Sequence, residues 1–190
     1  MRHRIFIAVN LPEGIKGKLK KYQESLPQLP VRWVKPDNFH ITLAFLGYLS
    51  EKELPDILET TRKVARHYNP FLVRLNKVCY APPQKTPPRM IWVEGETSDE
   101  LAALQNDLER RLFTRVASLG TERKTFRPHV TLGRIRQWEF ARIEPEERPE
   151  IDEDVSLSFE VESIEVMESR LKRGGAEYTA LKRCPLSDRD

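Results

Sequence analysis

The apolar and polar positions of the first half of the chain predict strands and helices in alternation. An alternating segment at 4–10 predicts a strand, and apolar residues at helical spacing predict a helix over 11–26. A short strand at 31–34 and a turn then lead to the tetrapeptide His-Ile-Thr-Leu at 40–43, which predicts another strand because its middle residues are β-branched or aliphatic. A second helix is predicted over 53–68.

The second half repeats this order. Its strands are predicted at 71–80, 90–95 and 126–136. Between the last two lies a helix that Thr97 or Ser98 can cap, with leucines on one face as far as Val116 and an end at Gly120. The last of these strands contains His-Val-Thr-Leu, a near-copy of the first tetrapeptide. The chain therefore carries strand, helix and motif strand twice.

The remaining segments complete a fold of the α+β class. The alternating segments 156–171 and 175–184 predict a hairpin that turns at Gly174–Gly175, and the acidic run 144–154 predicts a solvated loop. We expect one domain over 1–190, with two pseudo-symmetric lobes of antiparallel sheet, outer helices, and duplicated βαβ-like units around a central cleft.

Composition narrows the class of protein. The chain has 190 residues, of which 39% are hydrophobic and 32% charged, and a net charge of +3, too small for a non-specific DNA-binding polycation. The N-terminal apolar run is too short for a signal peptide, and no other run is long enough to span a bilayer, so we expect a monomeric cytoplasmic protein without membrane contact. Cys79 and Cys184 lack metal-ligand spacing and are expected to be free thiols.

The repeated tetrapeptide carries the candidate chemistry. Alternate residues of a strand face opposite ways, so in each copy the His and Thr share one face and the aliphatic residues share the other. The pairs are His40 with Thr42 and His129 with Thr131. An imidazole transfers protons near neutral pH, and a hydroxyl beside it can donate a hydrogen bond to an anion. Two such pairs facing one another would surround a single phosphate.

Other substrate contacts are less clearly indicated. Arg127 shares strand parity with His129, whereas Arg134 lies on the core face unless a bulge at Gly133 interrupts the strand, so Arg127 is the preferred phosphate contact. Phe45 has core parity, and stacking on a base would need a break in its strand. No carboxylate stands at ligand spacing beside either motif, so we expect no catalytic metal and no cofactor.

Paired His-x-Thr-x motifs in a duplicated α/β chain resemble the 2H phosphoesterase superfamily. The flanking segments, including RIFIAVNLP at 4–12 and RPHVTLGR at 127–134, are similar to those of the RNA 2',3'-cyclic phosphodiesterases, also called 2'-5' RNA ligases. The resemblance implies metal-independent opening of a 2',3'-cyclic phosphate at an RNA end to leave a 2'-phosphate, with reverse ligation possible in vitro. It further implies that His40 is the proton donor and His129 the acceptor.

Two alternatives remain open. One is a nucleotide- or RNA-binding module that kept the cleft without turnover, although arginine would serve mere anion binding better than paired histidines. The other is a phosphodiesterase of a small cyclic nucleotide phosphate. Activity on a cyclic-phosphate-ended oligonucleotide compared with a mononucleotide separates these interpretations.

Overall fold

The computed structural model describes residues 2–26, 28–115, 125–173 and 175–187. The strands are β1 (Arg2–Asn10), β2 (Val31–Trp33), β3 (His40–Ser50), β4 (Phe71–Ala81), β5 (Met90–Gly95), β6 (His129–Ile135), β7 (Asp152–Val161), β8 (Ser163–Lys172) and β9 (Gly175–Pro185). The helices are α1 (Glu13–Ser25), α2 (Leu54–Ala65), α3 (Asp99–Phe113) and the short α4 (Gln137–Phe140), with 3-10 turns η1 (Pro36–Asn38) and η2 (Pro145–Glu147). The expected α+β class is confirmed.

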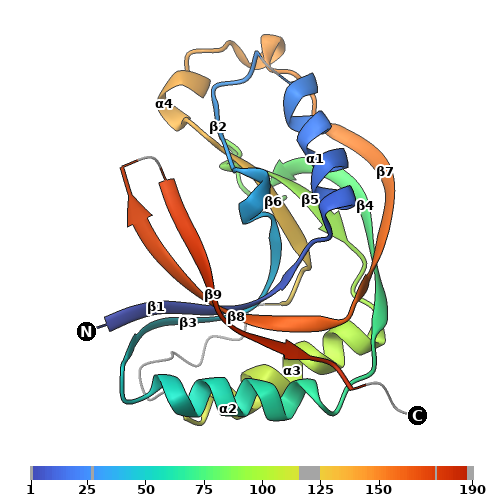
Figure 1. Cartoon of the computed structure of the whole chain (residues 1–190). Coiled ribbons are helices and arrows are strands. Elements are labelled where there is room, and N and C mark those ends of the chain that lie inside the picture. Colours follow the sequence, from blue (N-terminus) through green and yellow to red (C-terminus); the bar gives the residue numbers. More distant parts are fainter. Residues whose placement is uncertain (1, 27, 116–124, 174, 188–190) are drawn as a thin grey trace.

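The strands form one antiparallel sheet in the order β7-β4-β5-β6-β3-β1-β8-β9, with β2 added beside β6 (Figure 1). Its centre is the pair of motif strands, and Ile41 lies directly opposite Val130. These two residues hold the same position in their tetrapeptides, so an approximate twofold axis passes between them. The strand order agrees with this symmetry. Strands β5 and β1 flank the two motif strands, and each is the strand that begins a unit of strand, helix and motif strand.

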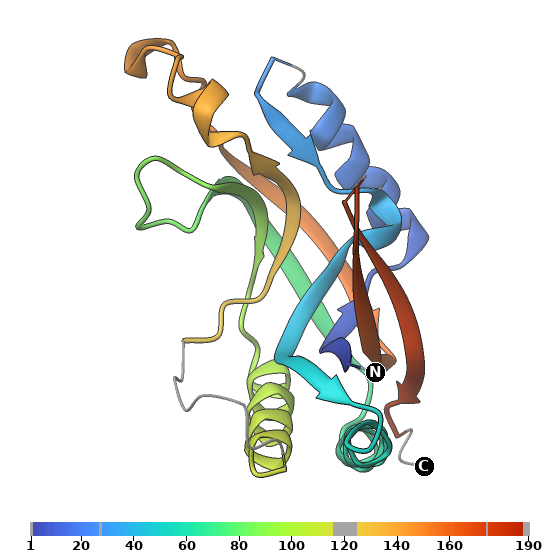
Figure 2. The same cartoon turned by 90° about the vertical axis from the view of Figure 1, so that its left-hand side faces the viewer.

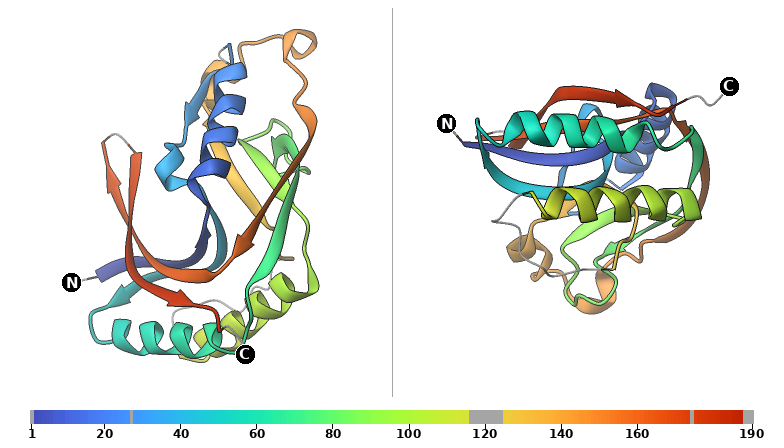
Figure 3. Two further views of the ribbon diagram at one scale, coloured as in Figure 1. Left: turned by 45° about the vertical axis from the view of Figure 1, so that its right-hand side comes forward. Right: turned by 90° about the horizontal axis from the view of Figure 1, so that it is seen from below.

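One continuous apolar core joins both halves. It includes Ile5 and Ile41 from the first half together with Val93 and Val130 from the second. Helices α2 and α3 lie side by side at one end of the molecule, whereas α1 lies at the other end beside β2 (Figures 1 and 2). In the views of Figure 3, β9 runs alongside α2, and both strands of the β8–β9 hairpin contact that helix.

The helix α3 illustrates how local sequence sets the element. Ser98 accepts a hydrogen bond from the backbone N–H of Leu101 and so caps the helix, as predicted for Thr97 or Ser98. The predicted apolar face is buried in the core. Its members are Leu101, Leu104, Leu108 and Leu112. Val116 and Gly120, where the sequence predicts the end, lie outside the described residues.

Each motif strand contains a bulge at the residue after its threonine. The register between β1 and β3 skips Leu43, and the register between β5 and β6 skips the equivalent Leu132. Both extra carbonyls are buried and each accepts a hydrogen bond from a buried glutamine. Gln105 of α3 donates to Leu43 over 3.3 Å, and Gln23 of α1 donates to Leu132 over 2.9 Å. Each half thus supplies the helix that holds the other half's bulge.

Two predictions for the C-terminal part are wrong. The segment 156–171 is not one strand but breaks at Glu162 into β7 and β8, which pair with β4 and β1 at distant places in the sheet. The acidic run 144–154 is not wholly a loop, because Asp152–Asp154 begin β7. Lys77 across the ladder offsets this charge, with its Nζ 2.6 Å from a carboxylate oxygen of Asp152. The β8–β9 hairpin itself is confirmed, although Gly174 lies outside the described residues.

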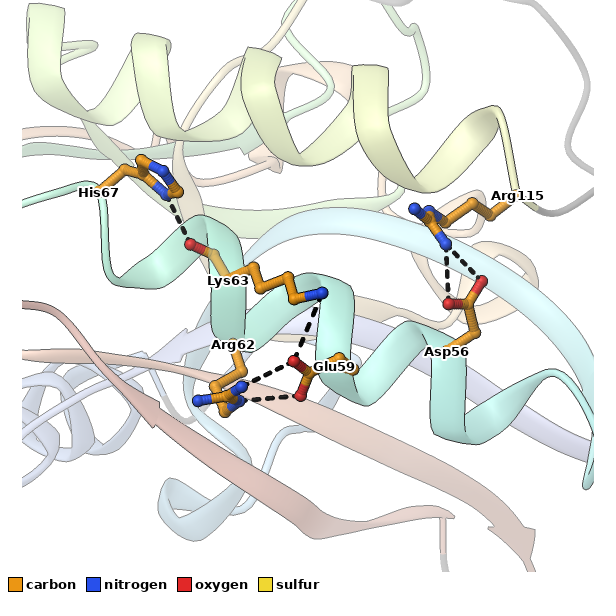
Figure 4. Close-up of polar contacts among 6 residues, drawn as sticks. All are labelled: Asp56, Glu59, Arg62, Lys63, His67 and Arg115. Carbon is orange, nitrogen blue, oxygen red and sulfur yellow. Dashed lines mark hydrogen bonds and ion pairs between the residues drawn. The ribbon is translucent and has the colours of Figure 1, made fainter.

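Polar contacts on the surface link α2 to neighbouring residues, and one of them involves His67, a histidine outside the motifs (Figure 4). Arg115 donates two hydrogen bonds to Asp56, at 2.7 and 2.9 Å, and joins the end of α3 to the start of α2. His67 donates from Nδ1 to the Lys63 carbonyl in the last turn of α2, at 2.6 Å. This placement at a helix C-terminus is electrostatically favourable and lies apart from the motif strands.

Candidate active site

The two motif strands present their His and Thr side chains on the sheet face opposite the core. In both strands the aliphatic residues are fully buried and the His and Thr are half-buried, as the alternation predicts. Antiparallel pairing of Ile41 with Val130 puts Thr42 and His129 on one side of that pair, and His40 and Thr131 on the other. The two His-x-Thr pairs are therefore brought together across the twofold axis.

Both imidazoles are held in the same way. The Nδ1 of His40 lies 2.7 Å from the Asn38 carbonyl, and the Nδ1 of His129 lies 2.8 Å from the Arg127 carbonyl. Because a carbonyl only accepts, each Nδ1 carries a proton and the neutral ring keeps its lone pair on Nε2. The Nε2 of His40 lies 3.1 Å from the Thr42 hydroxyl.

The backbone before each histidine fixes these carbonyls. Asn38 ends η1, and its side-chain amide donates to the Ala176 carbonyl of the β8–β9 hairpin over 2.9 Å. Arg127 precedes Pro128, and a residue before proline is restricted to extended backbone. A 3-10 turn before His40 and a proline before His129 thus give the two rings the same orientation.

Aromatic neighbours distinguish the two histidines. His129 stacks on Trp92, with ring centroids 3.7 Å apart and planes at 18°. His40 meets the edge of Tyr178 at 5.1 Å and tilts against Phe6 at 4.9 Å. The difference follows from the register, because Trp92 lies opposite Thr131 whereas the small Ala8 lies opposite Thr42.

Burial lowers the pKa of both imidazoles because it disfavours their charged forms. At His40 the Asn38 carbonyl partly opposes this pKa shift, and the nearby charge of His129 lowers the pKa further. At His129 the Arg127 carbonyl and the carboxylate of Glu94 both raise the pKa against the burial effect. Glu94 lies directly opposite His129 in the β5–β6 ladder, on the same face. The two rings therefore sit in electrostatically different surroundings.

A cleft of about 710 Å³ opens beside His40, between β2 and η1 on one side and the β8–β9 hairpin on the other. Its wall is basic and aromatic. The cations are Arg4, Arg32, Lys35, Arg134, Lys172 and Arg173, and the aromatic rings are Phe6, Trp33, Phe45 and Tyr178. The single carboxylate among these lining residues, Glu177, is paired with Lys172 at 2.6 Å. Such a wall suits a polyanion with flat, stackable groups.

Phe45 does not take the core position that its parity predicts. The bulge at Leu43 shifts the alternation, so Ala44 and Leu46 are buried while Phe45 is 47% exposed and lines the cleft. Its ring stacks on that of Phe6, with centroids 5.8 Å apart. The break that a base-stacking role requires is therefore present.

Arg134 is likewise moved off the core face. The bulge lies at Leu132, one residue before the Gly133 position expected from the sequence, and Arg134 emerges exposed into the cleft. Arg127 precedes β6, and its side chain is not among the described residues that line this cleft. The geometry therefore favours Arg134 over Arg127 as an anion contact.

Several residues near the site carry no clear signal in the sequence. Glu94 reaches His129 through sheet pairing, and Tyr178 reaches His40 through a ring contact from β9. The glutamines that hold the bulges are indicated only by being polar on apolar helix faces. Of the tryptophans, Trp92 is buried against His129 and Trp33 lines the cleft, while Trp138 is exposed and carries Arg142 over its ring at 3.5 Å. Both cysteines are free thiols, as predicted.

This geometry defines a class of proteins in which a duplicated fold brings two histidines to one face of a sheet. The family model described as "LigT like Phosphoesterase" matches the chain twice, at residues 9–92 and 93–178. The chain belongs to the LigT-like phosphoesterase family. The double match agrees with the internal symmetry seen at Ile41 and Val130.

Individual relatives cover almost the whole chain. The RNA 2',3'-cyclic phosphodiesterase of Thermus thermophilus is 34% identical over 188 residues, covering 96% of this chain and 90% of that protein. Among solved structures, TT0787 of Thermus thermophilus matches with a TM-score of 0.83 at 31% identity, covering 96% and 97% of the two chains. E. coli LigT complexed with 3'-AMP matches with a TM-score of 0.77 at 25% identity, covering 99% and 100%. Within the described residues, no helix is both long and apolar enough to cross a membrane.

Proposed function

We propose that this protein hydrolyses the 2',3'-cyclic phosphate at an RNA end to a 2'-phosphomonoester, using two histidines as general acid and base and no metal. The observation that carries the proposal is the matched pair of imidazoles on adjacent strands, each with Nδ1 donating to a carbonyl two residues earlier, so that Nε2 is the atom of each ring that can exchange a proton with substrate. The activity named for the Thermus thermophilus relative supports the substrate.

In this mechanism water attacks phosphorus while the bond to the 3'-oxygen breaks on the opposite side. The Nε2 of His129 takes a proton from the water, and the Nε2 of His40 gives a proton to the leaving 3'-oxygen. The product carries a 2'-phosphate and a free 3'-hydroxyl, and the two rings return to their starting states by exchanging protons with solvent. Each transfer is expected to contribute about a hundredfold to ten-thousandfold in rate.

The order of these roles follows the family resemblance, and Glu94 gives it a physical reason. A general base becomes positively charged during the reaction, and the carboxylate opposite His129 raises the pKa of that ring. His40 must begin protonated although burial lowers its pKa, so we propose that the anionic phosphate of the substrate supplies the charge that keeps it protonated.

The remaining side chains are assigned to binding. The hydroxyls of Thr42 and Thr131 donate to the non-bridging phosphate oxygens, where charge develops in the transition state. Arg134 adds a charge-assisted contact from the cleft wall, and Phe45 stacks on a base. Arg127 contributes chiefly its carbonyl, which orients His129.

The test is product identification from an oligonucleotide ending in a 2',3'-cyclic phosphate. Wild-type protein is expected to yield a 2'-phosphate, and His40→Ala and His129→Ala are each expected to lose about a hundredfold or more in kcat with circular dichroism unchanged. A 3'-phosphate product, or wild-type turnover in either variant, would refute the mechanism. An unmodified 3'-hydroxyl oligonucleotide serves as the blank.

Several companion predictions rest on this proposal. The same in-line displacement would give 2'-5' ligation when the 5'-hydroxyl of a second RNA replaces water, with His129 taking the proton of that hydroxyl and His40 protonating the leaving 3'-oxygen. Nucleotides are a second class of ligand, a prediction that the 3'-AMP complex of E. coli LigT supports. The cytoplasmic location and the monomeric state remain predictions.

A further inference from the structure

Exposed aromatic and aliphatic side chains gather at the outer end of the cleft. Among the described residues, the large hydrophobic side chains that are exposed are Phe45, Tyr48, Leu72, Trp138 and Leu171. Three of these lie together. Phe45 and Leu171 line the 710 Å³ cleft, and Tyr48 and Leu171 line an adjoining groove of about 350 Å³. Arg4, Ser169 and Leu171 line both, so the two hollows adjoin.

Sheet register aligns this region with the histidines. Across β1 and β3, Asn10 lies opposite His40, Phe6 opposite Phe45, Arg4 opposite Tyr48, and Arg2 opposite Ser50. Residues opposite one another share a face, and so do alternate residues of β1. The sheet face that carries His40 therefore continues outward along β1 for about 27 Å, at roughly 3.4 Å per residue.

Irregularities in β3 place the side chains of Phe45 and Tyr48 on this face. A second register shift, at Leu46, follows the bulge at Leu43, and Gly47 beside it has a φ of 69°, a conformation that residues with side chains rarely adopt. The guanidinium of Arg4 lies 5.0 Å from the centre of the Phe45 ring. Aromatic faces interleaved with arginines form the wall typical of single-stranded nucleic-acid grooves.

We propose that the surface formed by Arg2, Arg4, Phe45, Tyr48 and Leu171, here named the β1 track, binds the RNA strand upstream of the reacting end. This inference rests on the proposed function and extends it to the substrate class, a single-stranded oligonucleotide rather than a mononucleotide. The terminal cyclic phosphate lies at the histidines. Preceding bases stack on Phe45 and Tyr48, and their phosphates meet Arg4 and Arg2. RNA is favoured over a protein partner because the track is basic and continuous with the cleft.

The experiment compares kcat/KM for substrates of one, two, four and six nucleotides, all ending in a 2',3'-cyclic phosphate. Wild-type kcat/KM is expected to rise with length. Tyr48→Ala should lower kcat/KM for the six-nucleotide substrate about five- to hundredfold, as expected when a base loses its stacking partner. Arg4→Gln should make the salt dependence shallower by about 0.7 in the slope of log kcat/KM against log salt concentration, the value for one lost single-strand phosphate contact.

Trp138→Ala provides the matched control, because Trp138 is also an exposed aromatic beside an arginine but lies outside the cleft. It should keep the wild-type dependence on length. Equal kcat/KM at all lengths, or equal losses at all lengths in Tyr48→Ala, overturns the β1 track while leaving the proposed function in place. If no length is hydrolysed, the proposed function fails. The track is then judged by fluorescence anisotropy with the same oligonucleotides, where binding by Tyr48→Ala equal to wild type overturns it.

Discussion

Replacing Gly133 with alanine should displace β2 and so alter the cleft. A Cβ on Gly133 would lie 2.3 Å from Val31 Cγ1 and 2.9 Å from Trp33 Cε3. Carbon atoms in ordinary contact stand about 3.5–4.0 Å apart, so the side chains of Val31 and Trp33, or β2 with them, must move by roughly 1 Å or more. Overpacking of this kind costs about 1–3 kcal/mol, which for a chain of this size lowers Tm by about 2–12 °C.

Thermal unfolding followed by circular dichroism measures this cost. Gly17→Ala is the control, because nothing lies within 4 Å of a Cβ at Gly17 and alanine is favoured over glycine inside a helix such as α1. That variant should melt above wild type. In a double-mutant cycle, Val31→Ala removes the nearest methyl group and should make the Gly133→Ala change less costly than it is alone.

The same substitution should weaken catalysis without touching either histidine. Trp33 lies opposite Gly133, and both Trp33 and the adjacent Arg134 line the cleft, so KM should rise in Gly133→Ala. A melting temperature equal to that of wild type, together with additive effects in the cycle, would show that the close approach of β2 is not a tight contact.

The remaining predictions concern the chemistry. Glu94→Gln removes a charge that raises the pKa of His129, so the acidic limb of the pH profile of kcat/KM should move to lower pH. A limb that does not move would show that Glu94 does not influence the general base. Arg134→Ala should lower kcat/KM about ten- to hundredfold, as for loss of a hydrogen bond to a charged group, whereas Arg127→Ala should lower it less. A larger loss in Arg127→Ala than in Arg134→Ala would instead support the strand-parity prediction that Arg127 is the phosphate contact. Dialysis against EDTA should leave the rate unchanged, and loss of activity reversed by a divalent cation would contradict a metal-free mechanism.

The sequence was sufficient for most of the elements and for the motif faces. Alternation and helical spacing are local properties, so the strands around both tetrapeptides, a helix cap at Thr97 or Ser98, and the β8–β9 hairpin follow from them directly. The repeat of His-x-Thr-Leu also predicted that the fold is duplicated, which the double family match agrees with.

Parity arguments failed where a strand contains a bulge. Phe45 and Arg134 were expected on the core face, yet one extra residue before each reverses the alternation. The cause lies far away in the sequence, since the bulge carbonyls are held by Gln105 and Gln23 from the opposite halves. A single strand read alone contains no trace of these partners. The break at Glu162 escaped prediction for a similar reason, because the separation of β7 from β8 depends on their pairing strands.

The exchange of glutamines between halves bears on how a chain of this kind could arise. Two copies of a half-length ancestor, paired about a twofold axis, would have satisfied both buried carbonyls by symmetry, whereas a lone copy would have left one without a donor at about 1–3 kcal/mol. We propose that the present chain remains one cooperative unit for that reason. Joining the copies also freed them to drift apart, and the bulky Trp92 facing one threonine where Ala8 faces the other records that divergence. In an assembly of identical halves the two imidazoles would have identical surroundings until an asymmetric substrate bound, whereas in the linked chain their surroundings already differ.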